Sequence, residues 1–211
     1  MSDTFSLLET MRLEDGRVAR LERHLARMAA SARHFGFTWS EAHAASAVED
    51  ARILHPAGCW RLRLLLDPEG GVATTCSAHE GREPRVWRVV LAKRPVESGN
   101  ELLRHKTTDR TLYDTARHEQ PQADDVLLWN ERGEITEGTL ANVVAELDGA
   151  RVTPPVACGL LPGVYRAELL DNGEIRERVI TKEDLGKASR VWLINSLRGW
   201  IATTYDLPPT T

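Results

Sequence analysis

Two short segments, well apart in the sequence, each contain one residue that could take part in a chemical reaction, surrounded by small and polar residues. Lys106 lies in the segment His105–Arg110, and Glu137 lies in the segment Thr136–Thr139. A lysine amine whose pKa is lowered by burial or by a nearby cation such as Arg110 can attack a carbonyl carbon and form a Schiff base. A carboxylate can keep the nitrogen of a heterocycle protonated, which makes the ring an electron sink.

A third segment, Gly159–Arg166, predicts a helix that begins just after Pro162 and Gly163. The first N–H groups of a helix and its dipole can bind phosphate, so Val164 and Tyr165 are candidates for backbone contacts. A Schiff-base lysine, a ring-binding carboxylate and a phosphate-binding helix start are what pyridoxal 5'-phosphate (PLP) chemistry requires. Taken singly, each has an ordinary alternative as a solvated charge or a common helix start.

Other polar residues could complete such a site. His24 and Arg27 are three apart on a predicted helix and so share a face, where Arg27 could bind phosphate and His24 could serve as a structural hydrogen-bonding group. The segment Asn195–Gly199 ends a predicted strand with amide, hydroxyl and guanidinium groups, although an exposed loop would have the same composition.

Hydrophobic periodicity predicts a mixture of helices and strands without a strict βαβ repeat, which favours an α+β fold in two lobes. We expect a small lobe over residues 1–93, a linker over 94–101 and a large lobe over 102–211. The expected helices are 20–35, 109–118 and 163–170. Two more helices are expected after the capping segments 38–41 and 181–184, of which the first has capping-box spacing. The expected strands are 5–13, 17–18, 60–66, 72–77, 86–92, 126–129, 134–136, 142–147, 174–180, 190–195 and 200–203.

Composition excludes several classes of function. The 211 residues are 42% hydrophobic and 27% charged with a net charge of −4, which is ordinary for a globular protein and argues against a nucleic-acid groove. Cys59, Cys76 and Cys158 form no CxxC pair, and the histidines have no metal-ligand spacing, so we expect no metal site and a reducing compartment. No apolar run is long enough for a membrane span and no signal segment precedes Phe5, so a cytoplasmic location is expected.

Taken together, these segments resemble the class IV (fold type IV) PLP-dependent aminotransferase superfamily, which includes D-amino-acid and branched-chain aminotransferases. The resemblance implies that Lys106 holds PLP covalently and that Glu137 pairs with the ring nitrogen. It also implies that phosphate is bound by Arg27, by the backbone of Val164 and Tyr165, and by Ser196. Asn142 matches a family asparagine near the cofactor.

Within the superfamily, the chain looks most like 4-amino-4-deoxychorismate lyase. The segments that carry this likeness are Leu7–Arg12, Ser31–Phe37, His105–Arg110 and Asn195–Gly199. The likeness implies release of pyruvate from 4-amino-4-deoxychorismate to give 4-aminobenzoate in folate biosynthesis, with Lys106 as general base. The two substrate carboxylates need cationic partners, and the candidate substrate-binding residues are Arg12, Arg110, Asn195 and Arg198.

Two alternatives stay open at this point: a class IV aminotransferase acting on branched-chain or D-amino acids, and a non-catalytic PLP-fold binding protein. Family members usually begin with a further strand pair, so the fold is expected to be shortened at the N-terminus. Tyr165 stands where a threonine is common, which would remove a side-chain hydroxyl from the helix start. The resemblance also implies a homodimer with a small-molecule substrate.

Overall fold

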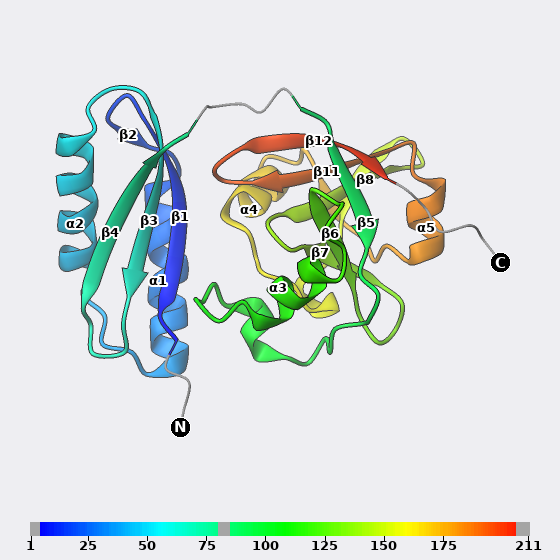
Figure 1. Ribbon diagram of the computed structural model, residues 1–211, viewed down its shortest axis with the longest axis horizontal. Helices are drawn as coiled ribbons and strands as arrows, with labels where there is room; N and C mark the ends of the chain where they lie inside the picture. The colour runs from blue at the N-terminus through cyan, green and yellow to red at the C-terminus, as the bar shows by residue number, and fades with distance from the viewer. Residues whose placement is uncertain (1–4, 80–84, 206–211) are drawn as a thin grey trace. The chain divides into compact units, whose positions relative to one another are not determined.

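The computed structural model describes residues 5–79 and 85–205, which form two compact units (Figure 1). Unit 1 contains residues 5–79, 105–109 and 196–198 of the described chain, and unit 2 contains 85–104, 110–195 and 199–205. Residues 1–4, over which no signal segment was expected, lie outside the described residues.

Unit 1 is built on a four-stranded antiparallel sheet with the strand order β2-β1-β3-β4. Its strands are β1 (Leu7–Glu14), β2 (Arg17–Val18), β3 (Cys59–Leu66) and β4 (Val72–Ala78). The predicted hairpin between β1 and β2 is present, with Asp15 and Gly16 at φ 47° and 72°. An Asp-Gly pair adopts such positive φ values at little cost, which is why the turn could be recognised from the sequence.

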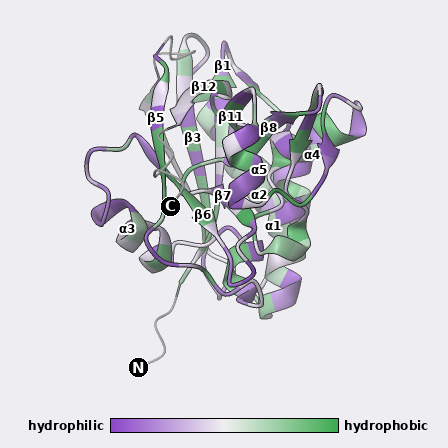
Figure 2. Ribbon diagram, turned by 90° about the vertical axis from the view of Figure 1, so that its right-hand side faces the viewer, coloured by the Kyte–Doolittle hydropathy of each residue, from purple (hydrophilic) through white to green (hydrophobic). Residues whose placement is uncertain are grey.

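Two helices, α1 (Leu21–Phe35) and α2 (Glu41–Leu54), pack on the sheet of unit 1 (Figure 1). Leu25, Met28 and Ala32 of α1 are buried in the core, and Figure 2 shows hydrophobic and hydrophilic segments along this helix. Burying one apolar face in this way stabilises an amphipathic helix. The capping residue of α2 is Ser40, whose hydroxyl accepts the N–H of His43, and not the Thr38 expected from the capping-box spacing.

Residues 105–109 add to the free edge of β1. Thr107 pairs with Leu7 in an antiparallel bridge, and the N–H of Leu8 donates to the carbonyl of Lys106 at 2.9 Å. The N–H of Thr108 donates to Ser6 at 2.8 Å. The backbone of Lys106 is therefore fixed by β1, so this segment lies in unit 1 although the sequence boundaries assigned it to the large lobe.

Unit 2 is an eight-stranded sheet in the order β10-β9-β8-β11-β12-β5-β6-β7. A further pairing of β7 with β8 closes β8, β11, β12, β5, β6 and β7 into a ring. The strands are β5 (Trp87–Leu91), β6 (Asp125–Trp129), β7 (Ile135–Gly138), β8 (Asn142–Leu147), β9 (Ala150–Thr153), β10 (Arg176–Glu177), β11 (Arg190–Asn195) and β12 (Gly199–Tyr205). Leu127, Val143 and Leu193 are fully buried in its largest apolar cluster.

Short helices cover the sheet of unit 2. These are η1 (Glu101–Arg104), α3 (Thr111–His118), η2 (Val156–Cys158), α4 (Val164–Asp171) and α5 (Lys182–Lys187). Helix α3 lies against β6, α4 against β11 and α5 against β8. The predicted cap of α5 is present as a reciprocal capping box between Thr181 and Asp184.

Two predicted segments differ from the structure. Residues 94–101, expected as a linker, belong to unit 2, because Val96 is buried and bridges Asn130 while the N–H of Ser98 donates to Glu131. The strand expected over 174–180 is reduced to β10, which pairs only with β9, a strand that the sequence did not predict. Both strands are too short for a clear period-2 pattern.

Within residues 5–79 and 85–205, no helix is long and apolar enough to cross a membrane. Within the same ranges, no group of three or more His, Cys, Asp or Glu side chains could hold a metal ion.

Candidate active site

In unit 2 the candidate carboxylate, Glu137, lies near the end of β7 and is only 4% exposed. One of its oxygens accepts the hydroxyl of Tyr113 at 2.9 Å and the N–H of Leu161 at 3.2 Å. The other lies 3.4 Å from the side-chain nitrogen of Asn142. Burial, and then the negative charge of Glu137, raise the pKa of Tyr113, so its hydroxyl stays protonated and keeps donating.

Asn142 connects Glu137 to the start of α4. It is the register partner of Glu137 across β7 and β8, and its amide nitrogen donates to the carbonyl of Leu161 at 2.9 Å. A Cβ at position 163 would lie only 1.9 Å from the side-chain oxygen of Asn142, so this position needs glycine. Gly163 thus lets the helix start approach the amide that contacts Glu137.

The N-terminus of α4 has the features of an anion site. Gly163 is its capping residue and makes no side-chain cap, and the first turn contains no acidic residue. Val164 is buried and Tyr165 is partly buried. The positive end of a helix dipole favours an anion at such a position.

In unit 1 a buried hydrogen-bonded chain joins Glu9, His24 and Ser196. Nδ1 of His24 lies 2.6 Å from Glu9, and Nε2 lies 2.8 Å from the hydroxyl oxygen of Ser196. Arg27, expected as a phosphate ligand, donates from Nε and Nη2 to the two oxygens of Glu9 at 2.8 and 2.6 Å. The fork geometry of this pair fixes the guanidinium plane.

The charges in this chain follow from its contacts. Burial by itself would raise the pKa of Glu9, but the charge of Arg27 and hydrogen bonds from His24 and Arg27 outweigh it and lower the pKa to about 2. Burial also lowers the pKa of His24, against the opposite effect of Glu9. Glu9 is therefore ionised and His24 is neutral at neutral pH. A neutral ring that donates from Nδ1 to Glu9 accepts at Nε2 from the Ser196 hydroxyl.

Lys106, the candidate nucleophile, is partly buried in unit 1. Its positive charge is one of the causes, after burial and Arg27, that lower the pKa of His24, so its side chain is electrostatically coupled to the Glu9–His24–Ser196 chain. The preceding residue, His105, is fixed by Ser31 at 2.9 Å and by stacking on His34 at a centroid distance of 4.4 Å.

The candidate substrate-binding residues fall in both units. Arg12 pairs with Glu14 at 2.6 Å, and Arg198 is partly buried in the unit 1 segment 196–198. Arg110 and Asn195 are in unit 2, where they donate to the carbonyls of Thr139 and Leu140 at 2.8 and 3.3 Å. The structure therefore does not gather these four residues within one unit.

Glu9 and Tyr113 were not predicted as site residues from the sequence. Glu9 alternates with Leu7, Met11 and Leu13 on the buried face of β1, so a charged residue in an apolar period-2 pattern was the available signal. Tyr113 gave no such signal, since its partner Glu137 is distant in sequence.

Comparison with known proteins identifies the family. The profile described as amino-transferase class IV matches residues 6–204. A Schizosaccharomyces pombe protein provisionally named aminodeoxychorismate lyase is 33% identical over 206 residues, which cover 92% of this chain and 86% of that protein.

Two solved structures similar to this chain belong to proteins with aminotransferase names. A Mesorhizobium loti protein provisionally named an amino-acid aminotransferase is 43% identical with a TM-score of 0.90, over 96% of this chain and 100% of that one. A fold IV transaminase of Curtobacterium pusillum is 26% identical with a TM-score of 0.81, over 95% and 76% of the two chains. The resemblance, the α+β fold class and the cofactor expected from the sequence are confirmed. The chain belongs to the class IV aminotransferase family, whose members are PLP-dependent enzymes of fold type IV.

Proposed function

We propose that this protein is a PLP-dependent 4-amino-4-deoxychorismate lyase, which releases pyruvate and gives 4-aminobenzoate, a folate precursor. The observation that carries the PLP chemistry is the buried carboxylate of Glu137 with its neutral donors Tyr113, Asn142 and Leu161. The lyase assignment is supported by the segment Asn195–Gly199 and by the name of the S. pombe relative.

The residues present fit the cofactor. The Tyr113 hydroxyl and the N–H of Leu161 donate to Glu137 and fix its position, which suits a carboxylate that must pair with a ring nitrogen. The start of α4 has no side-chain cap and no acid in its first turn, which suits a phosphate on Val164 and Tyr165. When bound, PLP supplies an electron sink for the pair of electrons left on a substrate carbon after proton loss.

The remaining cofactor-binding roles follow from the polar chain of unit 1. Ser196 and Arg27 would bind the phosphate, and Glu9 and His24 would fix the orientation of both side chains. Asn142 would hold Glu137 at a fixed distance from the start of α4. Lys106 would hold the cofactor covalently.

Lys106 would also move the proton. Its amine would accept the proton from the substrate ring carbon that carries the nitrogen. Loss of this proton and of the enolpyruvyl group makes the ring aromatic, and the same proton can return to the leaving group as it becomes pyruvate. Arg12, Arg110, Arg198 and Asn195 are our candidates for contacts with the two substrate carboxylates.

Direct assay tests the proposal. Purified protein with PLP and 4-amino-4-deoxychorismate should release 4-aminobenzoate and pyruvate in equal amounts, without any keto-acid cosubstrate. Absence of 4-aminobenzoate, together with amino transfer from an amino acid to 2-oxoglutarate, would reject the lyase in favour of a transaminase.

A class IV aminotransferase acting on a branched-chain or D-amino acid is the second candidate. The observation that favours it is the M. loti relative, whose name is that of an amino-acid aminotransferase and which is similar over its whole length. Both candidates use the same Lys106 and Glu137, so only the substrates separate them.

We also propose a cytoplasmic homodimer. The three free cysteines, Cys59, Cys76 and Cys158, suit a reducing compartment, and the family resemblance supports the dimer. Light scattering after size exclusion should give twice the 23.6 kDa mass of the chain, and a monomer would contradict the proposal.

A further inference from the structure

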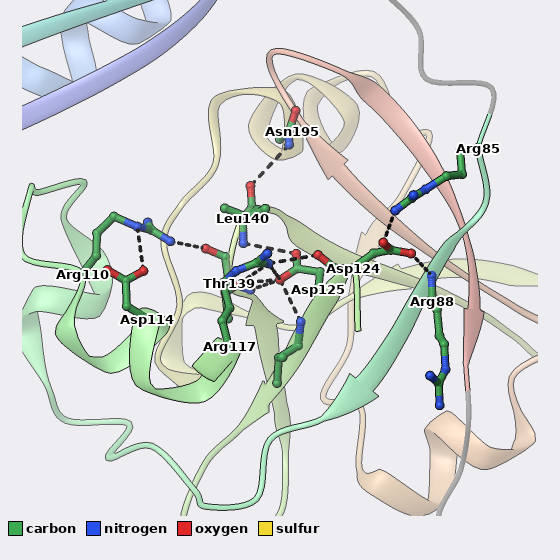
Figure 3. Close-up of polar contacts among 11 residues, drawn as sticks. Arg85, Arg88, Arg110, Asp114, Arg117, Asp124, Asp125, Thr139, Leu140 and Asn195 are labelled. Carbon is green, nitrogen blue, oxygen red and sulfur yellow. Dashed lines mark hydrogen bonds and ion pairs between the residues drawn. The ribbon is translucent and has the colours of Figure 1, made fainter. Parts of the chain in front are cut away.

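The turn between β7 and β8, residues 138–141, is anchored by a buried acid that the mechanism above does not use. Asp125 is fully buried at the start of β6. It accepts the N–H groups of Thr139 and Leu140 at 3.0 and 3.2 Å, and it also accepts the hydroxyl of Thr139 (Figure 3). One carboxylate thus holds two successive peptide groups of the turn.

The carbonyl groups of the same two residues are also held. Arg110 donates to the carbonyl of Thr139 at 2.8 Å, and Asn195 donates to the carbonyl of Leu140 at 3.3 Å. Figure 3 shows these two contacts and the contacts to Asp125 around the one turn. The turn is therefore fixed from β6, from the residue that precedes α3, and from the end of β11.

The turn directly joins Glu137 to Asn142. These two residues are register partners, and the turn between them is closed by the N–H of Gly138 donating to Ala141 at 2.8 Å. Any change in the turn must alter the spacing of the two side chains that face the cofactor in the proposed function.

We propose that Asp125 is a positioning residue for the cofactor: it fixes the 138–141 turn and thereby the distance and orientation of Glu137 and Asn142. This inference rests on the proposed function, because it assigns Asp125 a purpose only if Glu137 serves a PLP ring nitrogen. Asp125 itself touches neither substrate nor cofactor.

Gly138 supports this assignment. A Cβ at this position would lie 2.9 Å from a carboxylate oxygen of Asp125 and 3.1 Å from the side chain of Leu193. Glycine is therefore required so that Asp125 can reach the turn.

The surroundings of the Asp125 carboxylate are consistent with its role in fixing the turn. Burial raises the pKa of Asp125, and hydrogen bonds from Thr139, Val126 and Leu140 together with the charge of Arg117, 3.5 Å away, oppose that effect. An acid in the core is costly unless its oxygens are satisfied. Asparagine has nearly the same shape but only one acceptor oxygen, so it could not satisfy the same donors.

The neighbouring residue provides a matched control. Asp124 has the same side chain and directly precedes β6. Its carboxylate accepts the N–H of Arg88 at 2.8 Å and pairs with Arg85 (Figure 3). Asp124→Asn therefore makes the same chemical change without touching the turn.

The experiment compares wild type, Asp125→Asn and Asp124→Asn. Hydrogen exchange of the Thr139 and Leu140 amides in cofactor-free protein should accelerate in Asp125→Asn alone. The dissociation constant for PLP, titrated by absorbance, should rise about ten-fold in that variant, since it loses hydrogen bonds to a charged group. The pH midpoint of the bound cofactor's absorption change should shift by about one unit in Asp125→Asn and stay unchanged in Asp124→Asn.

Thermal unfolding shows whether each variant is folded at the temperature used. If Asp125→Asn does not fold, Thr139→Val, which removes the hydroxyl that donates to Asp125 and accepts from Arg117, should weaken PLP binding a few-fold, and Thr139→Ser should restore it. Wild-type PLP affinity and an unmoved pH midpoint in a folded Asp125→Asn or Thr139→Val variant would overturn the inference. Failure of the wild type to bind PLP would instead reject the proposed function, while the exchange result would still test the anchoring of the turn.

Discussion

Nδ1 of His24 lies 2.6 Å from a carboxylate oxygen of Glu9, with both side chains 1% exposed. This contact joins α1 to β1, and the other ring nitrogen of His24 extends it to Ser196. Because Arg27 binds the same carboxylate with two donors, Glu9 fixes Arg27 directly and Ser196 through His24, and these are the two unit 1 residues that we propose as phosphate ligands. The ionised Glu9 therefore fixes the relative positions of α1 and β1 and of the side chains that it binds.

Replacing Glu9 by glutamine should lower the free energy of unfolding by about 3 kcal/mol at pH 7, since it breaks a buried charge pair. The folded-state pKa of Glu9, about 2, lies below its ordinary value of 4.5. Its ionised form therefore stabilises the fold above about pH 4.5, and this contribution is lost as the pH falls from 4.5 towards 2. Urea unfolding of both proteins across this range should show a smaller pH dependence for Glu9→Gln.

Glu14→Gln is the control for that experiment. Glu14 is on the same strand but is exposed and pairs with Arg12 at the surface, so the substitution should change stability by less than about 1 kcal/mol. Equal pH dependence of Glu9→Gln and the wild type would contradict the charge assignment.

His24 should be neutral at pH 7 and protonated on Nδ1. Burial is the largest cause that lowers its pKa, and Glu9 fixes the proton on the nitrogen that faces it. Nitrogen NMR of the imidazole ring should show a protonated Nδ1 and an unprotonated Nε2 at pH 7. Ser196→Ala should shift only the Nε2 resonance, and a protonated Nε2 in the wild type would disprove this assignment.

Lys106→Ala should abolish the borohydride-trapped PLP adduct and the lyase activity, because no other group would hold the cofactor covalently. The exposed Lys93 provides the control, and Lys93→Ala should retain both properties. Mass spectrometry of trapped protein identifies the modified lysine, and an adduct on another lysine would show that the wrong nucleophile was chosen.

Much of the fold follows from local signals. The hairpin at Asp15 and Gly16 and the apolar face of α1, with Leu25 and Met28, depend on turn chemistry and on a 3.6-residue period that a short window reveals. The starts of α4 and α5 could also be predicted, because Pro162 and Gly163 precede the first helix and the capping residues 181–184 begin the second. Motif resemblance then supplied the family, because Lys106 and Glu137 stand in characteristic segments.

What could not be predicted depends on contacts between distant residues. The hydrogen bond from the N–H of Leu8 to the carbonyl of Lys106 places residues 105–109 in unit 1, and no local sequence pattern predicts this bond. Residue type makes Arg110 and Asn195 candidate substrate ligands, whereas their hydrogen bonds to the carbonyls of Thr139 and Leu140 depend on the three-dimensional fold.

Tyr113→Phe should weaken PLP binding about ten-fold or more while the protein stays folded. The hydroxyl donates to the buried Glu137 at 2.9 Å, and a hydrogen bond to a charged group contributes about 1.5–3 kcal/mol. Absorbance titration with PLP measures the effect. Tyr205→Phe is the control, because the buried Tyr205 hydroxyl has no hydrogen-bond partner among the described residues. An unchanged dissociation constant in Tyr113→Phe would show that Leu161 and Asn142 suffice to hold Glu137.

Gly163→Ala should disturb the α4 start and Glu137 together, because one added methyl group would lie 1.9 Å from the side-chain oxygen of Asn142. Asn142 would have to give up its bond to Leu161 or its contact with Glu137, so we expect a loss of about 1–3 kcal/mol in stability and weaker PLP binding. Gly99→Ala is the control, since a Cβ there meets nothing within 4 Å. If Gly163→Ala lowers stability but leaves PLP affinity at the wild-type value, Asn142 does not transmit the position of α4 to Glu137.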